Sequence, residues 1–234
     1  MERTVHFMNL ENGIEEVNEE IMKKINNLIK GAQFIGGKEI EDFEEEFAAY
    51  CGMEYAVGCS NGTDALILAL KSLGIGAGDT VIVPSNTFIA TAEAVTAVGA
   101  NVEFVDIEEE YYTICPKQLE EYILKNRAKN IKAIIPVHIY GQMADMEAIM
   151  KIADKYSIKV VEDAAQAHGA ELNGKKPGQY SGIAAFSFYP GKNLGAFGDA
   201  GAVITNDENL YKKMKMLVNH GRWKEKYSHE IEGY

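Results

Sequence analysis

The first part of the chain has the spacing of apolar residues that is typical of amphipathic helices. In the first segment the apolar positions are Ile14, Val17, Ile21, Ile25, Leu28 and Ile29. Glycines at positions 31, 36 and 37 interrupt the pattern, and a second helical pattern covers residues 40–50 and stops at Gly52. The sequence therefore predicts two helices before the first strand.

Beyond this point, short apolar stretches alternate with helical patterns. The predicted strands cover residues 55–58, 80–83, 102–105, 132–137, 158–162, 184–188 and 201–205, and the predicted helices cover 63–73, 88–98, 116–126, 145–156 and 207–218. This alternation is typical of an α/β fold with a parallel sheet between helices. We therefore expect one α/β domain over residues 1–234, built on a mostly parallel seven-stranded sheet flanked by helices.

Two details refine the expected sheet. Residues 133–137 form a continuous apolar run, which indicates a strand that is buried on both faces. The last two predicted strands have no helical pattern between them, whereas a parallel connection needs a crossover of a dozen or more residues. One antiparallel pair is therefore expected at that end.

Net charge, hydropathy and cysteine spacing exclude several classes of partner and location for this protein. The net charge of −12 argues against a nucleic-acid partner, because such proteins present a basic face. The sequence predicts no membrane-spanning helix, and residues 1–10 lack the pattern of a secretory signal. Cys51, Cys59 and Cys115 show no paired spacing, so we expect neither a disulfide framework nor a zinc site. A reducing, cytoplasmic location fits this pattern best.

Ligands of open α/β sheets bind beyond the carboxyl ends of the strands. The first such turn contains Gly62, which permits close approach of a ligand, and Thr63, which offers a hydroxyl group. The following helix presents free N–H groups and the positive end of its dipole. An anion site is one interpretation of this turn, and ordinary helix capping by Asn61 or Thr63 is the other.

Two further strand ends carry polar residues. The fifth predicted strand runs into Glu162 and Asp163, and a buried carboxylate is costly unless it has a partner such as a cationic ligand. Helix capping by Asp163 is the alternative. The sixth predicted strand leads to Ser187, and a Pro/Gly turn then leads to Lys192, a candidate nucleophilic amine among small and apolar residues. A lysine in a surface turn is the simpler interpretation of that stretch.

The three strand ends become informative when they are taken together. They supply an anion site, a buried acid and a lysine at one edge of one sheet. Pyridoxal 5′-phosphate (PLP) requires these same groups, namely a phosphate site, a partner for the pyridinium nitrogen and an amine for the Schiff base. The combination therefore favours a PLP site.

The same stretches give the chain a resemblance to the DegT/DnrJ/StrS-type sugar aminotransferases, a branch of the fold-type I PLP enzymes. The matching stretches are residues 31–37 (GAQFIGG), 61–66 (NGTDAL), 81–91 (VIVPSNTFIAT), 136–142 (PVHIYGQ), 162–170 (EDAAQAHGA) and 187–193 (SFYPGKN). Their order along almost the whole chain makes the resemblance specific. It implies a large domain like that of aspartate aminotransferase, with the N-terminal helices included.

The resemblance also implies roles for the candidate residues. Lys192 is expected to form the Schiff base and to move the proton between substrate and cofactor. Asp163 is expected to pair with the pyridinium nitrogen, and Gln166 to lie near the phenolic oxygen. Gly62, Thr63 and Ser187 are expected to hold the phosphate. Phe88 is expected to stack on the ring. His168 matches a position near the cofactor in the family, and a packing role is the alternative for it.

The implied reaction is amino transfer, because relatives that deoxygenate their substrate carry a histidine in place of Lys192. The expected substrates are an amino acid, with L-glutamate as the donor, and a nucleotide-linked keto-sugar. The pathways would be those of amino sugars, polysaccharides or antibiotic sugars. A homodimer with a shared active site is also expected.

Family members usually continue into a smaller C-terminal domain, and an asparagine in that region reaches the cofactor phosphate of the neighbouring subunit. Neither feature lies within these 234 residues. Two alternatives to catalysis therefore stay open. One is a non-catalytic protein that binds PLP or a nucleotide sugar as a sensor, and the other is an inactive truncated chain.

Overall fold

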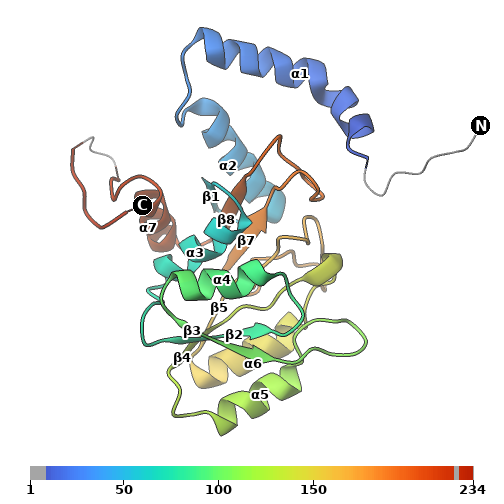
Figure 1. Ribbon diagram of the computed structural model, residues 1–234, viewed down its shortest axis with the longest axis vertical. Helices are drawn as coiled ribbons and strands as arrows, with labels where there is room; N and C mark the ends of the chain where they lie inside the picture. Colours follow the sequence, from blue (N-terminus) through green and yellow to red (C-terminus); the bar gives the residue numbers. More distant parts are fainter. Residues whose placement is uncertain (1–8, 224–226, 234) are drawn as a thin grey trace, which may run out of the picture. The chain divides into compact units, whose positions relative to one another are not determined.

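The computed structural model describes residues 9–223 and 227–233 (Figure 1). The chain divides into two compact units, residues 1–43 and 44–234. The first unit contains helix α1 (Glu11–Lys30) and the start of helix α2 (Lys38–Cys51), which continues into the second unit. Both helices occupy the segments that the apolar spacing predicts.

The second unit contains the sheet and the other helices. Its strands are β1 (Tyr55–Cys59), β2 (Thr80–Pro84), β3 (Asn101–Val105), β4 (Ile131–Ile134), β5 (Lys159–Val160), β6 (Glu162–Asp163), β7 (Ile183–Ser187) and β8 (Gly201–Thr205). Its helices are α3 (Gly62–Ser72), α4 (Ile89–Ala97), α5 (Pro116–Lys125), α6 (Met146–Tyr156) and α7 (Glu208–Leu217), with a short 3₁₀ turn η1 (Ile139–Gly141). The five helices predicted for this part of the chain are confirmed, each to within one residue at either end.

Hydrogen bonding arranges the strands in two sets of four. One set has the order β3-β2-β4-β5 and is parallel throughout. The other has the order β1-β8-β7-β6, and β8 runs antiparallel to both of its neighbours. Only Val161 separates β5 from β6, and its N–H donates to the carbonyl of Ile134 at 3.0 Å. The Asp163 N–H donates to the carbonyl of Pro136 at 2.9 Å, so the two sets are parts of one mixed sheet.

The prediction of seven strands needs a correction, because the described residues form eight. The segment predicted as one strand over 158–162 changes its partner at Val161, so that β5 pairs with β4 and β6 pairs with β7. The strand predicted over 132–137 ends at Ile134, although residues 135–137 stay buried. Pro136 has no N–H with which to continue the ladder. The antiparallel pair expected near the end of the sheet is confirmed by β7 and β8.

The core lies on both faces of the sheet. Along β2, Val81 and Val83 belong to one buried cluster, to which α3, α4 and α7 contribute, whereas Ile82 belongs to a second cluster with α5 and α6. Successive side chains of a strand point to opposite faces, so this division places helices on each side. The pattern is that of a sheet buried on both faces, as the continuous apolar runs predict.

Two expectations from composition can be compared with the described residues. No helix among residues 9–223 and 227–233 has the length and apolar character needed to cross a membrane. Cys51, Cys59 and Cys115 are free thiols.

Candidate functional site

A cavity of about 540 Å³ lies at the carboxyl ends of the strands. All seven residues that the sequence nominates line it, namely Gly62, Thr63, Phe88, Asp163, Gln166, Ser187 and Lys192. They come from the start of α3, the N-cap of α4, β6 and the turn after it, the end of β7, and the loop that follows β7. The structure therefore brings together residues that are up to 130 positions apart (192 − 62) in one pocket of the size that small ligands occupy.

The start of α3 forms one end of this cavity. Asn61 is the N-cap, and its side chain accepts a hydrogen bond from the Asp64 N–H at 2.8 Å. The capping interpretation of this turn is therefore confirmed, but capping uses only one of the N–H groups of the first turn. The N–H groups of Gly62 and Thr63 precede the first intrahelical bond, which the Ala65 N–H makes to Asn61 at 3.0 Å. Capping and anion binding are thus compatible here.

Asp163 lines the cavity and is 5 % exposed. Thr91 donates its hydroxyl proton to Asp163 Oδ2 at 2.9 Å, and the Ala165 N–H donates to Oδ1 at 3.2 Å. Burial raises the pKa of Asp163 above the ordinary range for aspartate, and these two hydrogen bonds oppose the rise. A positive charge in the cavity would be favoured next to the ionised carboxylate.

Lys192 and Phe88 also line this cavity. The Lys192 N–H donates to the carbonyl of Tyr189 at 2.8 Å, which closes the turn that carries the lysine. Phe88 is 70 % exposed, although it is a large apolar residue at a cavity wall. An exposed aromatic ring beside a pocket is available for stacking on a flat ligand or for contact with another chain.

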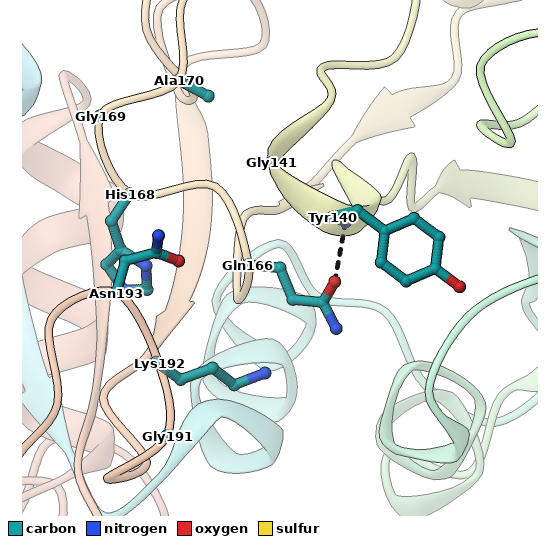
Figure 2. A pocket seen from close by; sticks show the side chains of 9 residues that line it. All are labelled: Tyr140, Gly141, Gln166, His168, Gly169, Ala170, Gly191, Lys192 and Asn193. Carbon is teal, nitrogen blue, oxygen red and sulfur yellow. Dashed lines mark hydrogen bonds between the residues drawn. The ribbon is translucent and has the colours of Figure 1, made fainter. Parts of the chain in front are cut away.

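Gln166 lines both this cavity and a second one of about 410 Å³, whose lining residues Figure 2 shows. Lys192 also lines both cavities. The backbone N–H of Tyr140 donates to Gln166 Oε1 at 2.7 Å. Tyr140 has a positive φ of 57°, an uncommon conformation for a residue other than glycine.

His168 lines the second cavity and not the first. Its ring lies 5.4 Å from the ring centres of both Phe186 and Phe188, which supports the packing interpretation. Neither ring nitrogen has a hydrogen-bond partner among the described residues. Burial lowers the pKa of His168, a backbone contact with Ser187 opposes the change, and the positive charge of Lys192 adds to it.

Sequence reasoning assigned no role to two groups beside the site. One is Thr91, which holds the Asp163 carboxyl, and the other is the buried pair of His138 and Glu162, whose side chains lie 2.9 Å apart. Thr91 and His138 occur in the motifs quoted for the resemblance, but their partners are distant in sequence. The one local signal for Thr91 is its position three residues after Phe88, in the first turn of the same helix.

The arrangement offers three chemical functions within one cavity. The start of α3 and the Ser187 hydroxyl can hold an anion, Asp163 can face a cation, and Lys192 offers a primary amine. Within the described part of the chain, no group of three or more His, Cys, Asp or Glu side chains is placed to hold a metal ion.

Comparison with known families agrees with these features. The sequence model described as the DegT/DnrJ/EryC1/StrS aminotransferase family matches residues 15–234. The chain is 48 % identical over 229 residues to a dTDP-3-amino-3,4,6-trideoxy-alpha-D-glucose transaminase from Streptomyces venezuelae. It is 47 % identical over 218 residues to a UDP-N-acetyl-3-dehydro-alpha-D-glucosamine 3-aminotransferase from Acidithiobacillus ferrooxidans. These alignments cover 98 % and 93 % of this chain but 59 % and 58 % of the relatives, so the chain spans about three fifths of their length.

Solved structures share the fold. A crystal structure of S. venezuelae DesV in complex with a ketimine intermediate superposes with a TM-score of 0.94 at 47 % identity, and the match covers 99 % of this chain and 61 % of that one. An aminotransferase of the same family from Brucella abortus superposes with a TM-score of 0.93 at 36 % identity, over 98 % of this chain and 62 % of that one. The expected fold class, the large domain of a PLP aminotransferase, is therefore confirmed.

Proposed function

The chain belongs to the DegT/DnrJ/EryC1/StrS aminotransferase family, and we propose that its main cavity binds PLP and transfers an amino group to a keto carbon of a nucleotide-linked sugar. The observation that carries this proposal is the convergence of an anion site, a buried carboxyl and a lysine amine on one cavity of about 540 Å³. The names of the similar transaminases support a nucleotide-linked sugar as the substrate class.

The start of α3 fits the phosphate group. A β-carbon added to Gly62 would lie 2.6 Å from the β-carbon of Ser187, so the backbone of Gly62 reaches the cavity only because it has no side chain. The N–H groups of Gly62 and Thr63 can then donate to phosphate oxygens at the positive end of the helix dipole. Ser187, at the end of β7, adds a hydroxyl donor.

Asp163 fits the pyridinium end of the cofactor. A carboxyl group whose pKa is raised by burial is stabilised in its ionised form by a neighbouring cation. In this role the carboxylate of Asp163 keeps a proton on the ring nitrogen, while the Thr91 hydroxyl fixes its second oxygen. The bound cofactor supplies an electron sink for the carbon that loses its proton.

Three other residues have defined tasks in the proposed site. Lys192 provides the amine that holds the cofactor covalently and, once released by a substrate amine, moves a proton at the reacting carbon. Phe88 covers one face of the ring, and Gln166 donates to the phenolic oxygen. The proposed amino donor is an amino acid, with L-glutamate as the first compound to test.

The proposal also includes a homodimer in which a second copy completes the site. Phe88 and Tyr189, which line the cavity, are 70 % and 59 % exposed, and Phe197, two residues before the lining residue Asp199, is 62 % exposed. Exposed apolar groups of this size are typical of protein contacts. Light scattering on the purified chain tests this part, and a monomer that retains tight PLP binding would contradict it. The proposed location is the cytoplasm, supported by the three free thiols.

The central experiment is borohydride reduction of the chain after incubation with PLP, followed by peptide mass spectrometry. The expected result is a reduced adduct on Lys192 and none in Lys192→Ala. Release of 2-oxoglutarate from glutamate in the presence of nucleotide-linked keto-sugars then tests amino transfer. Visible absorption of the unreduced, PLP-loaded protein that glutamate does not bleach would favour the non-catalytic sensor, or an inactive chain, over the transaminase.

A further inference from the structure

A buried histidine–glutamate pair lies next to the residues that line the proposed cofactor site. His138 and Glu162 are both 0 % exposed, and His138 Nε2 lies 2.9 Å from Glu162 Oε2. Neither residue lines the two cavities, yet each is next in sequence to residues that do. Two buried polar side chains without contact with the site need a structural or functional reason, since their burial is costly.

The hydrogen bonds of the pair define its protonation. The backbone N–H of Ala144 donates to His138 Nδ1 at 3.2 Å, and a backbone N–H can only donate, so Nδ1 carries no proton. The proton of the neutral ring is therefore on Nε2, which donates to Glu162. Glu162 Oε1 accepts from the Ser181 N–H at 3.0 Å and from the Ser181 hydroxyl at 2.8 Å. Both oxygens of the buried carboxylate thus have donors.

The bond from Ala144 to Nδ1 closes a loop. It joins residue 144 to residue 138, so the segment between them folds around the imidazole ring. Within this segment Tyr140 and Gly141 have positive φ angles of 57° and 84°. The same segment carries the Tyr140 N–H, which donates to Gln166 Oε1 at 2.7 Å. The imidazole therefore supports a backbone donor that contacts the Gln166 amide.

This contact decides which end of the Gln166 amide is available to a ligand. Because the Tyr140 N–H can only donate, the atom that faces it must be the amide oxygen. The NH₂ group is then on the side away from Tyr140, as Figure 2 shows. Without the backbone donor either end of the amide could face the ligand, and a carbonyl group would repel an anionic oxygen.

The backbone of Asp163 is fixed by the same segment. The His138 N–H donates to the carbonyl of Asp163 at 2.9 Å, and the Asp163 N–H donates to the carbonyl of Pro136 at 2.9 Å. The Glu162 side chain points to the opposite face of β6 from Asp163, where the imidazole holds it. The imidazole is thus bonded to Glu162, which precedes Asp163, and to Ala144, at the end of the segment that carries the Tyr140 N–H.

We propose that His138 is a positioning residue that, through its Nδ1 bond to Ala144, orients the Gln166 amide as a hydrogen-bond donor to the cofactor's phenolic oxygen. This inference rests on the proposed function for the identity of the acceptor. The orientation itself is a property of the chain alone, so part of it can be tested without the cofactor.

The test compares His138→Leu, which removes both ring nitrogens, with His138→Asn and His138→Gln. The oxygen of asparagine can occupy the position of Nδ1, so His138→Asn keeps the acceptor for Ala144 and loses the bond to Glu162. The nitrogen of glutamine can occupy the position of Nε2, so His138→Gln has the reverse effect. All three changes are expected to lower thermal stability, but only the leucine and glutamine variants should release the loop.

In the cofactor-free protein the readout is hydrogen exchange of the Tyr140 amide. It should be at least about tenfold faster in His138→Leu and His138→Gln than in the wild type, and close to wild type in His138→Asn, since an amide that loses its acceptor loses protection. Equal exchange rates in all folded variants would overturn the inference, whether or not the chain binds PLP. If His138→Leu fails to fold, the asparagine and glutamine variants carry the comparison.

In the PLP-loaded protein the readout is the pH midpoint of the visible absorption. A donor to an ionised oxygen stabilises the ionised form, so losing the Gln166 donor should raise this midpoint, by about one pH unit. His138→Leu should reproduce the shift of Gln166→Leu, and the double variant should show no further shift. A wild-type midpoint in His138→Leu would overturn the inference, whereas absence of any Lys192 adduct in the wild type would refute the proposed function.

Discussion

The β-carbon that Gly62 lacks would lie 2.6 Å from the β-carbon of Ser187. This distance is well below normal van der Waals contact. The start of α3 can therefore lie this close to the end of β7 only because position 62 has no side chain. The approach places helix N–H groups and a serine hydroxyl at the same end of the cavity.

Gly62→Ala is therefore expected to push α3 away from β7 and open the anion site. The affinity for PLP should fall at least about tenfold, and overpacking should lower the free energy of unfolding by about 1–3 kcal/mol. Fluorescence titration with PLP and urea unfolding measure the two effects. Gly76→Ala is a suitable control, because its nearest neighbour would be the carbonyl of Val98 at an ordinary 3.5 Å. Wild-type affinity in folded Gly62→Ala would contradict the proposed phosphate site.

The raised pKa of Asp163 predicts a pH dependence of stability in the cofactor-free protein. The folded state holds the carboxyl proton more tightly than the unfolded chain, in which aspartate has a pKa of about 3.9. The free energy of unfolding should then fall as the pH rises above this value, until the folded carboxyl has ionised. Asp163→Asn removes this part of the pH dependence, which urea unfolding between pH 4 and neutrality would detect.

PLP should reverse this effect, because a pyridinium ion beside Asp163 lowers its pKa. In wild type the stabilisation by saturating PLP should therefore grow over the pH range in which the cofactor-free protein loses stability. Asp163→Asn should bind PLP more weakly and lose most of its transaminase activity. If the variant transferred amino groups at the wild-type rate, Asp163 would have only the structural role that its contacts with Thr91 and Ala165 give it.

The fold was largely predictable because its signals are local. Each helix of the second unit carries its apolar face within about ten residues, and this face is enough to define it. The exchange of partners at Val161 was not predictable, since it depends on whether β4 or β7 lies alongside. Pro136 is a local signal that β4 ends early, because proline has no N–H for the ladder. The continuous apolar run of residues 133–137 outweighed this signal in the prediction.

The site was predictable only where a residue stands at a strand end. Asp163 and Ser187 are the last residues of β6 and β7, and Lys192 lies in the loop after β7, so the α/β topology brings them together. Thr91 and His138 act through partners 72 and 24 positions away, and no spacing rule connects such pairs. The αL conformation of Tyr140 was equally hidden, because tyrosine carries no preference for it.

The lowered pKa of His168 predicts an effect of the opposite sign to that of Asp163. The unfolded chain binds a proton near the ordinary histidine pKa of about 6.5, whereas the folded protein resists protonation of the half-buried ring. The free energy of unfolding should therefore fall as the pH falls below 6.5.

His168→Leu keeps the contact with Phe186 and Phe188 and removes the titrating group, so it should flatten this part of the curve. Urea unfolding at several pH values from 5 to 8 measures the slope. His229→Gln, at an exposed position, serves as the matched histidine control and should keep the wild-type slope. An unchanged slope in His168→Leu would assign the acid sensitivity to another group.

A partly buried ion pair joins α7 to α2, and the same glutamate binds β1, so its loss should lower stability. Glu44 is 8 % exposed and accepts hydrogen bonds from the Gly58 N–H at 2.8 Å and from Lys215 Nζ at 2.8 and 3.1 Å. Glu44→Ala leaves the strand N–H and the lysine without their acceptor, so the free energy of unfolding should fall by about 2–3 kcal/mol.

Glu44→Gln separates the two contributions. Its amide oxygen can still accept from the Gly58 N–H, so this variant should lose less stability than Glu44→Ala. Glu45→Ala, one position along on the exposed side of α2, is the control and should change the free energy of unfolding by less than about 0.5 kcal/mol. Denaturant unfolding of the three variants gives the comparison. Equal losses in Glu44→Ala and Glu44→Gln would assign the whole effect to Lys215 and none to the strand N–H.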